Sequence, residues 1–87
     1  MMDLELEIRE HILRTLKNGD EMDLGPDDFT SNGKYDLIQV KQIAKIMGVE
    51  GLIEYKEVSN NTGFPLLILL PLGLTYMKQK GIVLPKV

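Results

Sequence analysis

The hydrophobic positions of the chain predict a helix near its N-terminus. Apolar side chains recur every four residues between Asp3 and Lys17, and this spacing places them on one face of an α-helix. The members of this stripe are Leu4, Ile8, Ile12 and Leu16. The sequence Asn18-Gly19-Asp20 is expected to end the helix, because glycine readily adopts the left-handed conformation of a helix C-terminus.

A second amphipathic helix is predicted over residues 36–49. Its apolar positions follow spacings of three and four residues, as expected of a buried helix face. They are Leu37, Val40, Ile43, Ala44 and Met47. The opposite face is mostly polar and holds Gln39, Lys41, Gln42 and Lys45, with Ile38 among them. Gly51 is the expected left-handed cap.

The segment between these helices is expected to form short elements. Met22 and Leu24 alternate with acidic residues, which is typical of a short edge strand. Pro26 suits the first position of a one-turn helix that ends at Phe29, because proline lacks an N–H that the helix would leave unpaired. We expect the Phe29 ring to be buried.

The C-terminal part of the pattern predicts a β-hairpin followed by a closing helix. Residues 52–58 alternate between apolar and polar side chains, and residues 65–70 form an apolar run. Asparagine and glycine in the segment 59–63 are typical of a turn, so a hairpin is expected over residues 52–70. Pro71 then begins a helix over residues 71–80.

The apolar run from Phe64 to Leu74 is not expected to cross a membrane. It has eleven residues and contains Pro65, Pro71 and Gly73, whereas a membrane helix needs about 20 apolar residues. The acidic N-terminus does not resemble a secretory signal. Because the chain also lacks cysteine, we expect a cytoplasmic protein.

Composition predicts one small domain with an uneven charge distribution. The 87 residues suffice for a single domain, here residues 1–87. Residues 1–33 carry three basic and nine acidic side chains, a net −6, whereas residues 34–87 carry seven lysines and four acidic side chains, a net +3. The sum is the −3 of the whole chain. A polarised domain of this kind can present a basic face to an anion.

The order of these elements resembles the winged-helix form of the helix-turn-helix. Gly51-Leu52-Ile53 is similar to the entry into the first wing strand of that family. The segment Leu69–Gly73, which reads Leu-Leu-Pro-Leu-Gly, is similar to the Leu-Thr-Pro-x-Gly entry into its last helix. In length and layout the chain also resembles small YjcQ-like proteins. The resemblance implies an α+β fold with a three-helix core, a two-stranded wing and a C-terminal helix.

Leu70 departs from this family pattern. It stands where the family has a capping threonine, and loss of such a cap costs about 0.5–2 kcal/mol. Burial of a leucine contributes about 1.5–3 kcal/mol. We therefore expect Leu70 to be buried, either in the core or under a partner.

The resemblance implies that residues 36–49 are a recognition helix and that the partner is double-stranded DNA. Gln42 suits pairing with adenine, Ile38 suits contact with a thymine methyl group, and Lys41 and Lys45 suit phosphates. These four residues form one stripe at spacings of three and four. Further backbone contacts are expected from Lys34, Asn60 and Asn61. The function implied is that of a transcriptional regulator that acts as a homodimer.

Two other interpretations of these residues stay open. Lysine and glutamine are common on any solvated helix face, and the stripe contains no arginine. The alternative function is a winged-helix-like module that binds protein and not DNA. It is motivated by an apolar run in the second strand. A strand of a sheet that packs on one face alternates apolar and polar residues, but this run does not. A second copy of the chain is therefore expected to cover the outer face of this strand. The run consists of Leu66, Leu67, Ile68, Leu69 and Leu70.

Other candidate chemistry is weak. His11 is the sole histidine and no cysteine is present, so a nucleophilic catalytic set cannot be assembled around them. The acidic segment Asp20–Asp28 lacks the ligand spacing of a calcium-binding EF-hand. We therefore expect no enzyme, no cofactor and no metal, with His11 in a packing role.

Overall fold

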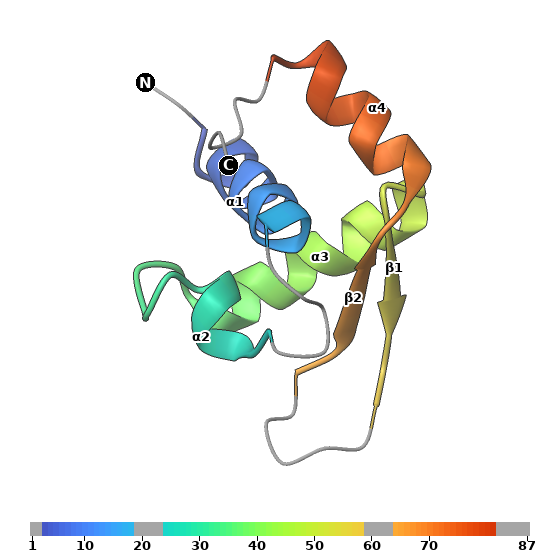
Figure 1. The fold of residues 1–87 in the computed structure, drawn as a ribbon. Helices are drawn as coiled ribbons and strands as arrows, with labels where there is room; N and C mark the ends of the chain where they lie inside the picture. Colours follow the sequence, from blue (N-terminus) through green and yellow to red (C-terminus); the bar gives the residue numbers. More distant parts are fainter. Residues whose placement is uncertain (1–2, 19–23, 59–63, 82–87) are drawn as a thin grey trace.

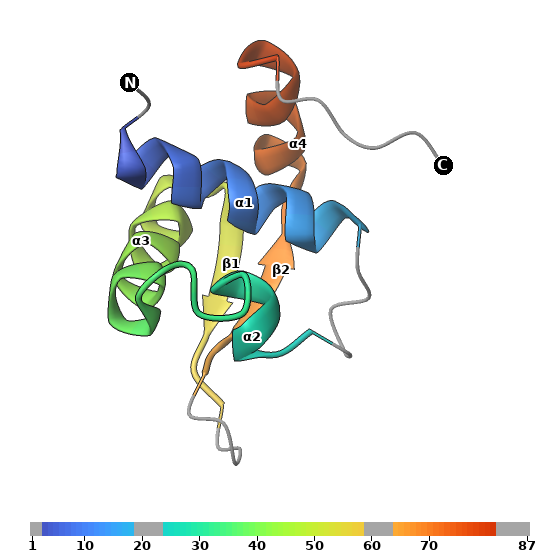
Figure 2. The ribbon, with the colours of Figure 1, turned by 90° about the vertical axis from the view of Figure 1, so that its left-hand side faces the viewer.

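The computed structural model describes residues 3–18, 24–58 and 64–81. Within these ranges the chain has an α+β fold with four helices and a two-stranded antiparallel sheet (Figure 1). The elements are α1 (Leu4–Asn18), α2 (Pro26–Phe29), α3 (Leu37–Glu50), β1 (Ile53–Lys56), β2 (Leu66–Leu69) and α4 (Pro71–Gln79). Figure 2 shows α1 lying across α3 and the hairpin strands.

The long helix α3 is defined by a cap at each end. The Asp36 side chain accepts a hydrogen bond from the Gln39 backbone N–H at 3.1 Å, which satisfies one of the unpaired donors of the first turn. At the other end, Gly51 adopts a left-handed conformation with φ of +85°. The predicted glycine cap is confirmed, and the helix lies within one residue of its predicted bounds.

The short helix α2 anchors the segment between the two long helices. Pro26 is its first residue and Phe29 its last, as predicted. The Phe29 ring is buried and stacks on Phe64 with ring centroids 5.2 Å apart. The edge strand predicted at Met22 and Leu24 is wrong at Leu24, which lies in no strand and packs against the core; Met22 lies outside the described residues.

The two strands pair in a register that separates their faces. Ile53 lies opposite Leu69 and Tyr55 opposite Leu67, and all four pack in or against the core. The outer sheet face holds the remaining positions, Glu54, Lys56, Leu66 and Ile68. Both strands are shorter than predicted. The turn at 59–63, with Asn60 and Asn61, lies outside the described residues.

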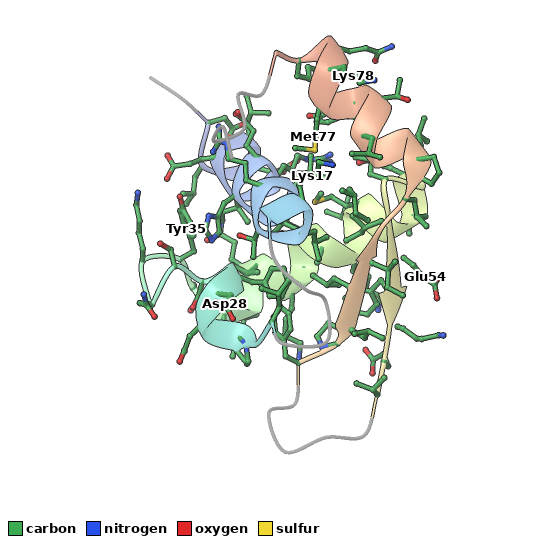
Figure 3. The ribbon with its side chains drawn as sticks, in the orientation of Figure 1. Lys17, Asp28, Tyr35, Glu54, Met77 and Lys78 are labelled. Atoms are coloured by element: carbon green, nitrogen blue, oxygen red, sulfur yellow. The ribbon has the colours of Figure 1, made fainter. Side chains whose placement is uncertain are left out.

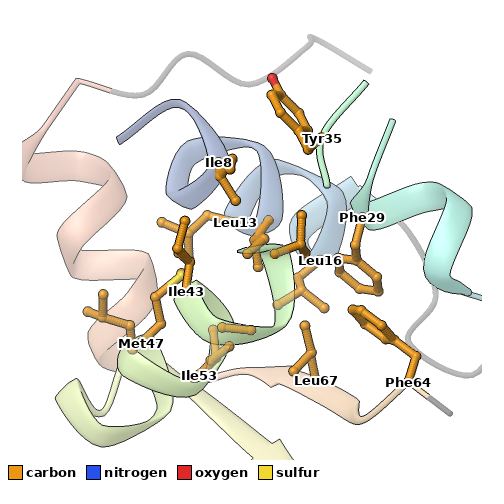
Figure 4. Packing of buried hydrophobic residues seen from close by; sticks show 14 of the residues in the cluster. Ile8, Leu13, Leu16, Phe29, Tyr35, Ile43, Met47, Ile53, Phe64 and Leu67 are labelled. Atoms are coloured by element: carbon orange, nitrogen blue, oxygen red, sulfur yellow. The ribbon is translucent and has the colours of Figure 1, made fainter. Parts of the chain in front are cut away.

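Every helix contributes to one core (Figure 4). α1 supplies three fully buried side chains, and the others come from α2, α3, the strands and α4. Those from α1 are Ile8, Ile12 and Leu13. Because α1 lies at the centre of this packing, it holds α3 against the hairpin.

The apolar run from Phe64 to Leu74 is divided between two elements. Its first half contains β2, and its second half begins α4 at Pro71. Leu70 precedes the helix as its N-cap without a side-chain cap hydrogen bond, and it is half-buried and not fully covered. Among the helices of the described ranges, none has the length and apolar character needed to span a membrane.

An ion pair connects α1 to the C-terminal end of α3. The Arg9 guanidinium donates hydrogen bonds to both carboxylate oxygens of Glu50, at 2.6 and 2.9 Å. These hydrogen bonds lower the pKa of Glu50, although partial burial opposes the shift. Since this pKa is lower in the folded state than the ordinary value of 4.5, the stabilisation is present above pH 4.5 and is lost as the pH falls through the folded value.

Replacement of Glu50 with glutamine is therefore expected to lower the free energy of unfolding at pH 7 by about 0.5–1 kcal/mol, a range that allows for solvent screening of this half-exposed carboxylate. The difference from the unmodified protein should shrink below pH 4.5. Urea denaturation followed by circular dichroism at pH 7 and pH 3 measures both values. Glu54→Gln is the control, because it makes the same chemical change in an ion pair within one strand, in which Lys56 Nζ lies 3.5 Å from a carboxylate oxygen of Glu54. Equal losses in the two variants would contradict the role of the Arg9 pair.

Candidate nucleic-acid interface

The exposed face of α3 is the main candidate site. α1 and β1 pack against the other side of this helix, and Figure 2 shows no further described element on its outward side. We use the name exposed face of α3 for five residues whose side chains are open to solvent. They are Ile38, Gln42, Lys45, Ile46 and Val49.

The structure brings together part of the predicted DNA-binding set. Ile38, Gln42 and Lys45 are exposed on this face, whereas Lys41 is half-buried at its border. Lys34 is exposed in the turn before α3, where its Nζ atom lies 3.7 Å from a carboxylate oxygen of Glu7. Asn60 and Asn61, predicted at the wing tip, lie outside the described residues.

Three exposed aliphatic residues of α3 were not among the predicted site residues. One of them, Leu37, was expected on the buried face of the helix but is 39% exposed. Val49 is 86% exposed and Ile46 is 45% exposed, alongside Ile38 at 66%. Val49 follows Ile38 by eleven positions, so a helical projection at 100° per residue places it only about 20° away. This projection could have identified Val49 from the sequence.

An open groove lies beside the exposed face of α3. It has a volume of about 380 Å³ and is lined mainly by α3 and β1. Gly48 lets these elements approach closely, because a Cβ atom there would lie 2.9 Å from the Cβ atom of Tyr55. Lys45 and Val49 belong to the α3 wall, and Glu54 to the β1 wall. The groove therefore connects the exposed face of α3 to the hairpin.

The acidic groups nearest to this surface already have partners. Asp36 caps α3, Glu50 is held by Arg9, and Glu54 pairs with Lys56. Lys45 forms no ion pair with any residue in the described part of the chain. The exposed face of α3 thus carries a positive charge that is available to an external anion.

A second polar cluster joins α1 to the turn before α3. The Tyr35 hydroxyl donates a hydrogen bond to Glu7 at 2.6 Å, and burial together with this bond raises the pKa of Tyr35 to about 12. The His11 ring lies 5.3 Å from the Tyr35 ring, and its Nε2 atom is 2.8 Å from the Asp28 carbonyl oxygen. These contacts place His11 in the packing between α1 and α2.

No metal centre is assembled in the ranges that the structure covers, since they contain no group of three or more metal-ligating side chains. Asp27 and Asp28 of the acidic segment are exposed, and the part at residues 20–23 lies outside the described ranges. Asp28 instead accepts a hydrogen bond from the Gly25 N–H at the start of α2, at 2.8 Å. This contact stabilises a helix N-terminus.

The predicted partner surface on β2 is less open than its composition suggests. Leu67 is buried, and Leu66, Ile68, Leu69 and Leu70 are half-buried. Of these, Leu70 lines the groove beside α3. The most exposed aliphatic side chains are instead on α3 and at the start of α4, where Leu72 is 53% exposed.

Comparison of the chain with family models, with curated proteins and with solved structures finds no match. The candidate interface is therefore defined by the exposure, charge and spacing of the side chains on α3. Its strongest features are the outward position of Ile38 and Gln42 and the unpaired charge of Lys45 within the described ranges.

Proposed function

We propose that the protein is a winged-helix DNA-binding protein that inserts α3 into the major groove of a duplex and acts as a homodimeric transcriptional regulator. The observation that carries the proposal is the exposed face of α3, on which Ile38, Gln42 and Lys45 lie together on an outward-facing helix. A major groove about 12 Å wide admits an α-helix. The fourteen residues of α3 extend over about 21 Å, enough to follow several base pairs.

The charges support a modest, salt-sensitive affinity. Lys45 and Lys41 lie on or beside the exposed face of α3, and Lys34 precedes the helix. Phosphate contacts from lysine position a protein on DNA, whereas contacts to base edges give specificity. With three such contacts, the slope of log K against log salt concentration is expected to be about −2.7.

Fluorescence anisotropy with a labelled random-sequence duplex tests this proposal. We expect binding at 50 mM salt and a loss of affinity of about 40-fold at 200 mM, as the expected slope requires. An affinity that does not change with salt concentration, or no binding at 50 mM, would contradict it. A matched single strand serves as the competitor that distinguishes duplex binding from general polyanion binding.

A protein-binding module of the same architecture is the second candidate. It is favoured by the high exposure of Val49 and Leu72. Leu72 lies beside the C-terminal cap of α3, since a Cβ atom at Gly51 would lie 3.4 Å from Leu72 Cδ2. Exposed apolar surface at the end of α3 and the start of α4 is the kind of surface that a protein partner can cover. Two results together would favour this candidate: no DNA binding at 50 mM salt, and a molar mass in light scattering above 9.8 kDa that falls on Val49→Ser.

A further inference from the structure

The exposed face of α3 is unusually aliphatic for a surface that would meet phosphates. Three of its five members are Ile38, Ile46 and Val49, and all three are open to solvent. They are β-branched, so their χ1 angles are already restricted and little rotamer freedom is lost on contact with a partner. Single exposed aliphatic residues need no explanation, but three beside Gln42 and Lys45 define the chemistry of the surface.

Among the base edges of the major groove, thymine alone presents a methyl group. Adenine presents an acceptor at N7 and a donor at N6, which a glutamine amide can pair with at the same time. Guanine is read by arginine or lysine; α3 contains no arginine, and its exposed lysine is Lys45. Lys45 lines the groove toward β1, a position suited to the phosphate backbone beside the hairpin.

The spacing along α3 agrees with this chemistry. Ile38 and Gln42 are four residues apart, which is about 6 Å along the helix axis. Base pairs follow one another at about 3.4 Å, so the two side chains can reach base pairs one or two steps apart. Val49 lies about 16 Å from Ile38 along the same axis and extends the aliphatic surface further along the groove.

We infer that the exposed face of α3 selects A·T base pairs over G·C pairs, with Ile38 in contact with a thymine methyl group and Gln42 paired with an adjacent adenine. This inference rests on the proposed function, since it assigns the base-pair class that the same helix reads.

Three duplexes of equal length and charge test the inference by anisotropy at 50 mM salt: one rich in A·T, one rich in G·C, and one A·T duplex with deoxyuridine in place of thymidine. Deoxyuridine removes the methyl group and leaves the charge and the hydrogen-bonding groups in place. We expect the A·T duplex to bind about tenfold more tightly than the G·C duplex, in line with one bidentate pairing. Deoxyuridine should weaken binding about fourfold for each thymine methyl group that the protein buries.

Variants assign the effect to individual side chains. Ile38→Ala should abolish most of the discrimination between thymidine and deoxyuridine, and Gln42→Ala should reduce the preference for A·T over G·C. Matched controls are Leu72→Ala and Gln79→Ala, because both residues are exposed on α4. Since Ile38 and Gln42 are themselves exposed, their replacement should leave the circular dichroism spectrum unchanged.

The outcomes separate the inference from the proposed function. Equal affinity for the three duplexes, or a preference for the G·C duplex, overturns the inference and leaves DNA binding intact. Discrimination that persists in Ile38→Ala and Gln42→Ala overturns the assignment to these side chains. Binding to none of the duplexes at 50 mM salt overturns the proposed function and the inference with it.

Discussion

Replacement of Gly73 with alanine is expected to destabilise the fold by about 3 kcal/mol or more, at the upper end of overpacking effects. A Cβ atom at this position would lie 2.3 Å from the carbonyl oxygen of Leu52 and 2.8 Å from Leu69 Cδ1. The Leu52 backbone cannot easily retreat, because its carbonyl accepts the Leu70 N–H at 3.2 Å and its own N–H is bonded to Met47. The added methyl group must therefore push α4 away from Leu52.

The expected destabilisation by Gly73→Ala is opposite to what helix propensity alone would predict. Gly73 lies inside α4 without a positive φ, and in an open helix alanine would be favoured over glycine by about 1 kcal/mol. Thermal unfolding followed by circular dichroism measures the outcome, with an expected fall in Tm of about 12–24 °C for a domain of this size. Gly25→Ala is the control, since the nearest atom to its added Cβ is 4.0 Å away. Similar falls in the two variants would contradict the close approach of α4 to the Leu52 carbonyl.

The helices were largely predictable because local chemistry defines them. Proline begins α2 and α4 at Pro26 and Pro71, and Gly51 ends α3. These signals act within one or two turns, so they can be recognised without knowledge of the fold. The glycine of the Leu-Leu-Pro-Leu-Gly segment is required by a contact between distant parts of the chain. Gly73 lies where α4 passes the Leu52 carbonyl, and a side chain there would clash with it.

The exposure of individual side chains was less predictable, since it depends on how the elements pack. Lys41 and Gln42 are adjacent in sequence, yet Lys41 is half-buried and Gln42 is exposed. On the outer sheet face, Leu66 lies opposite Lys56 and Ile68 opposite Glu54. The aliphatic stems of long charged side chains can cover apolar neighbours, so this register is expected to bury part of both residues within a single chain.

This partial burial makes β2 a weaker candidate interface than α3. A homodimer through β2 stays a prediction, but its main motivation was an apolar sheet face without cover, and Leu66 and Ile68 are half-buried. The aliphatic side chains with the highest exposed fractions are those of Val49 and Ile38. The winged-helix assignment also remains a proposal, supported by the order of the elements and by the antiparallel hairpin after α3.

Simultaneous replacement of Lys41 and Lys45 with glutamate is expected to weaken duplex binding about 100-fold or more at 100 mM salt. Each phosphate contact contributes about −0.9 to the slope of log K against log salt concentration. At 100 mM salt, one such contact therefore raises the affinity nearly tenfold over its value at 1 M salt, and its removal loses this gain. Removal of two should reduce the magnitude of the slope by about 1.8, and the new carboxylates add repulsion. Anisotropy titrations over a range of salt concentrations measure both quantities.

The matched control is Lys78→Glu with Lys80→Glu, which changes the net charge by the same amount on another surface. Both lysines are exposed near the end of α4, and Figure 3 shows Lys78 far from α3. If binding were a response to net charge alone, the two double variants would weaken it equally. Because Lys41 is half-buried, Lys45→Glu alone is the variant that separates a weaker phosphate interaction from altered folding, and it should still weaken binding about tenfold. A slope unchanged in Lys45→Glu would exclude α3 as the surface that contacts phosphates.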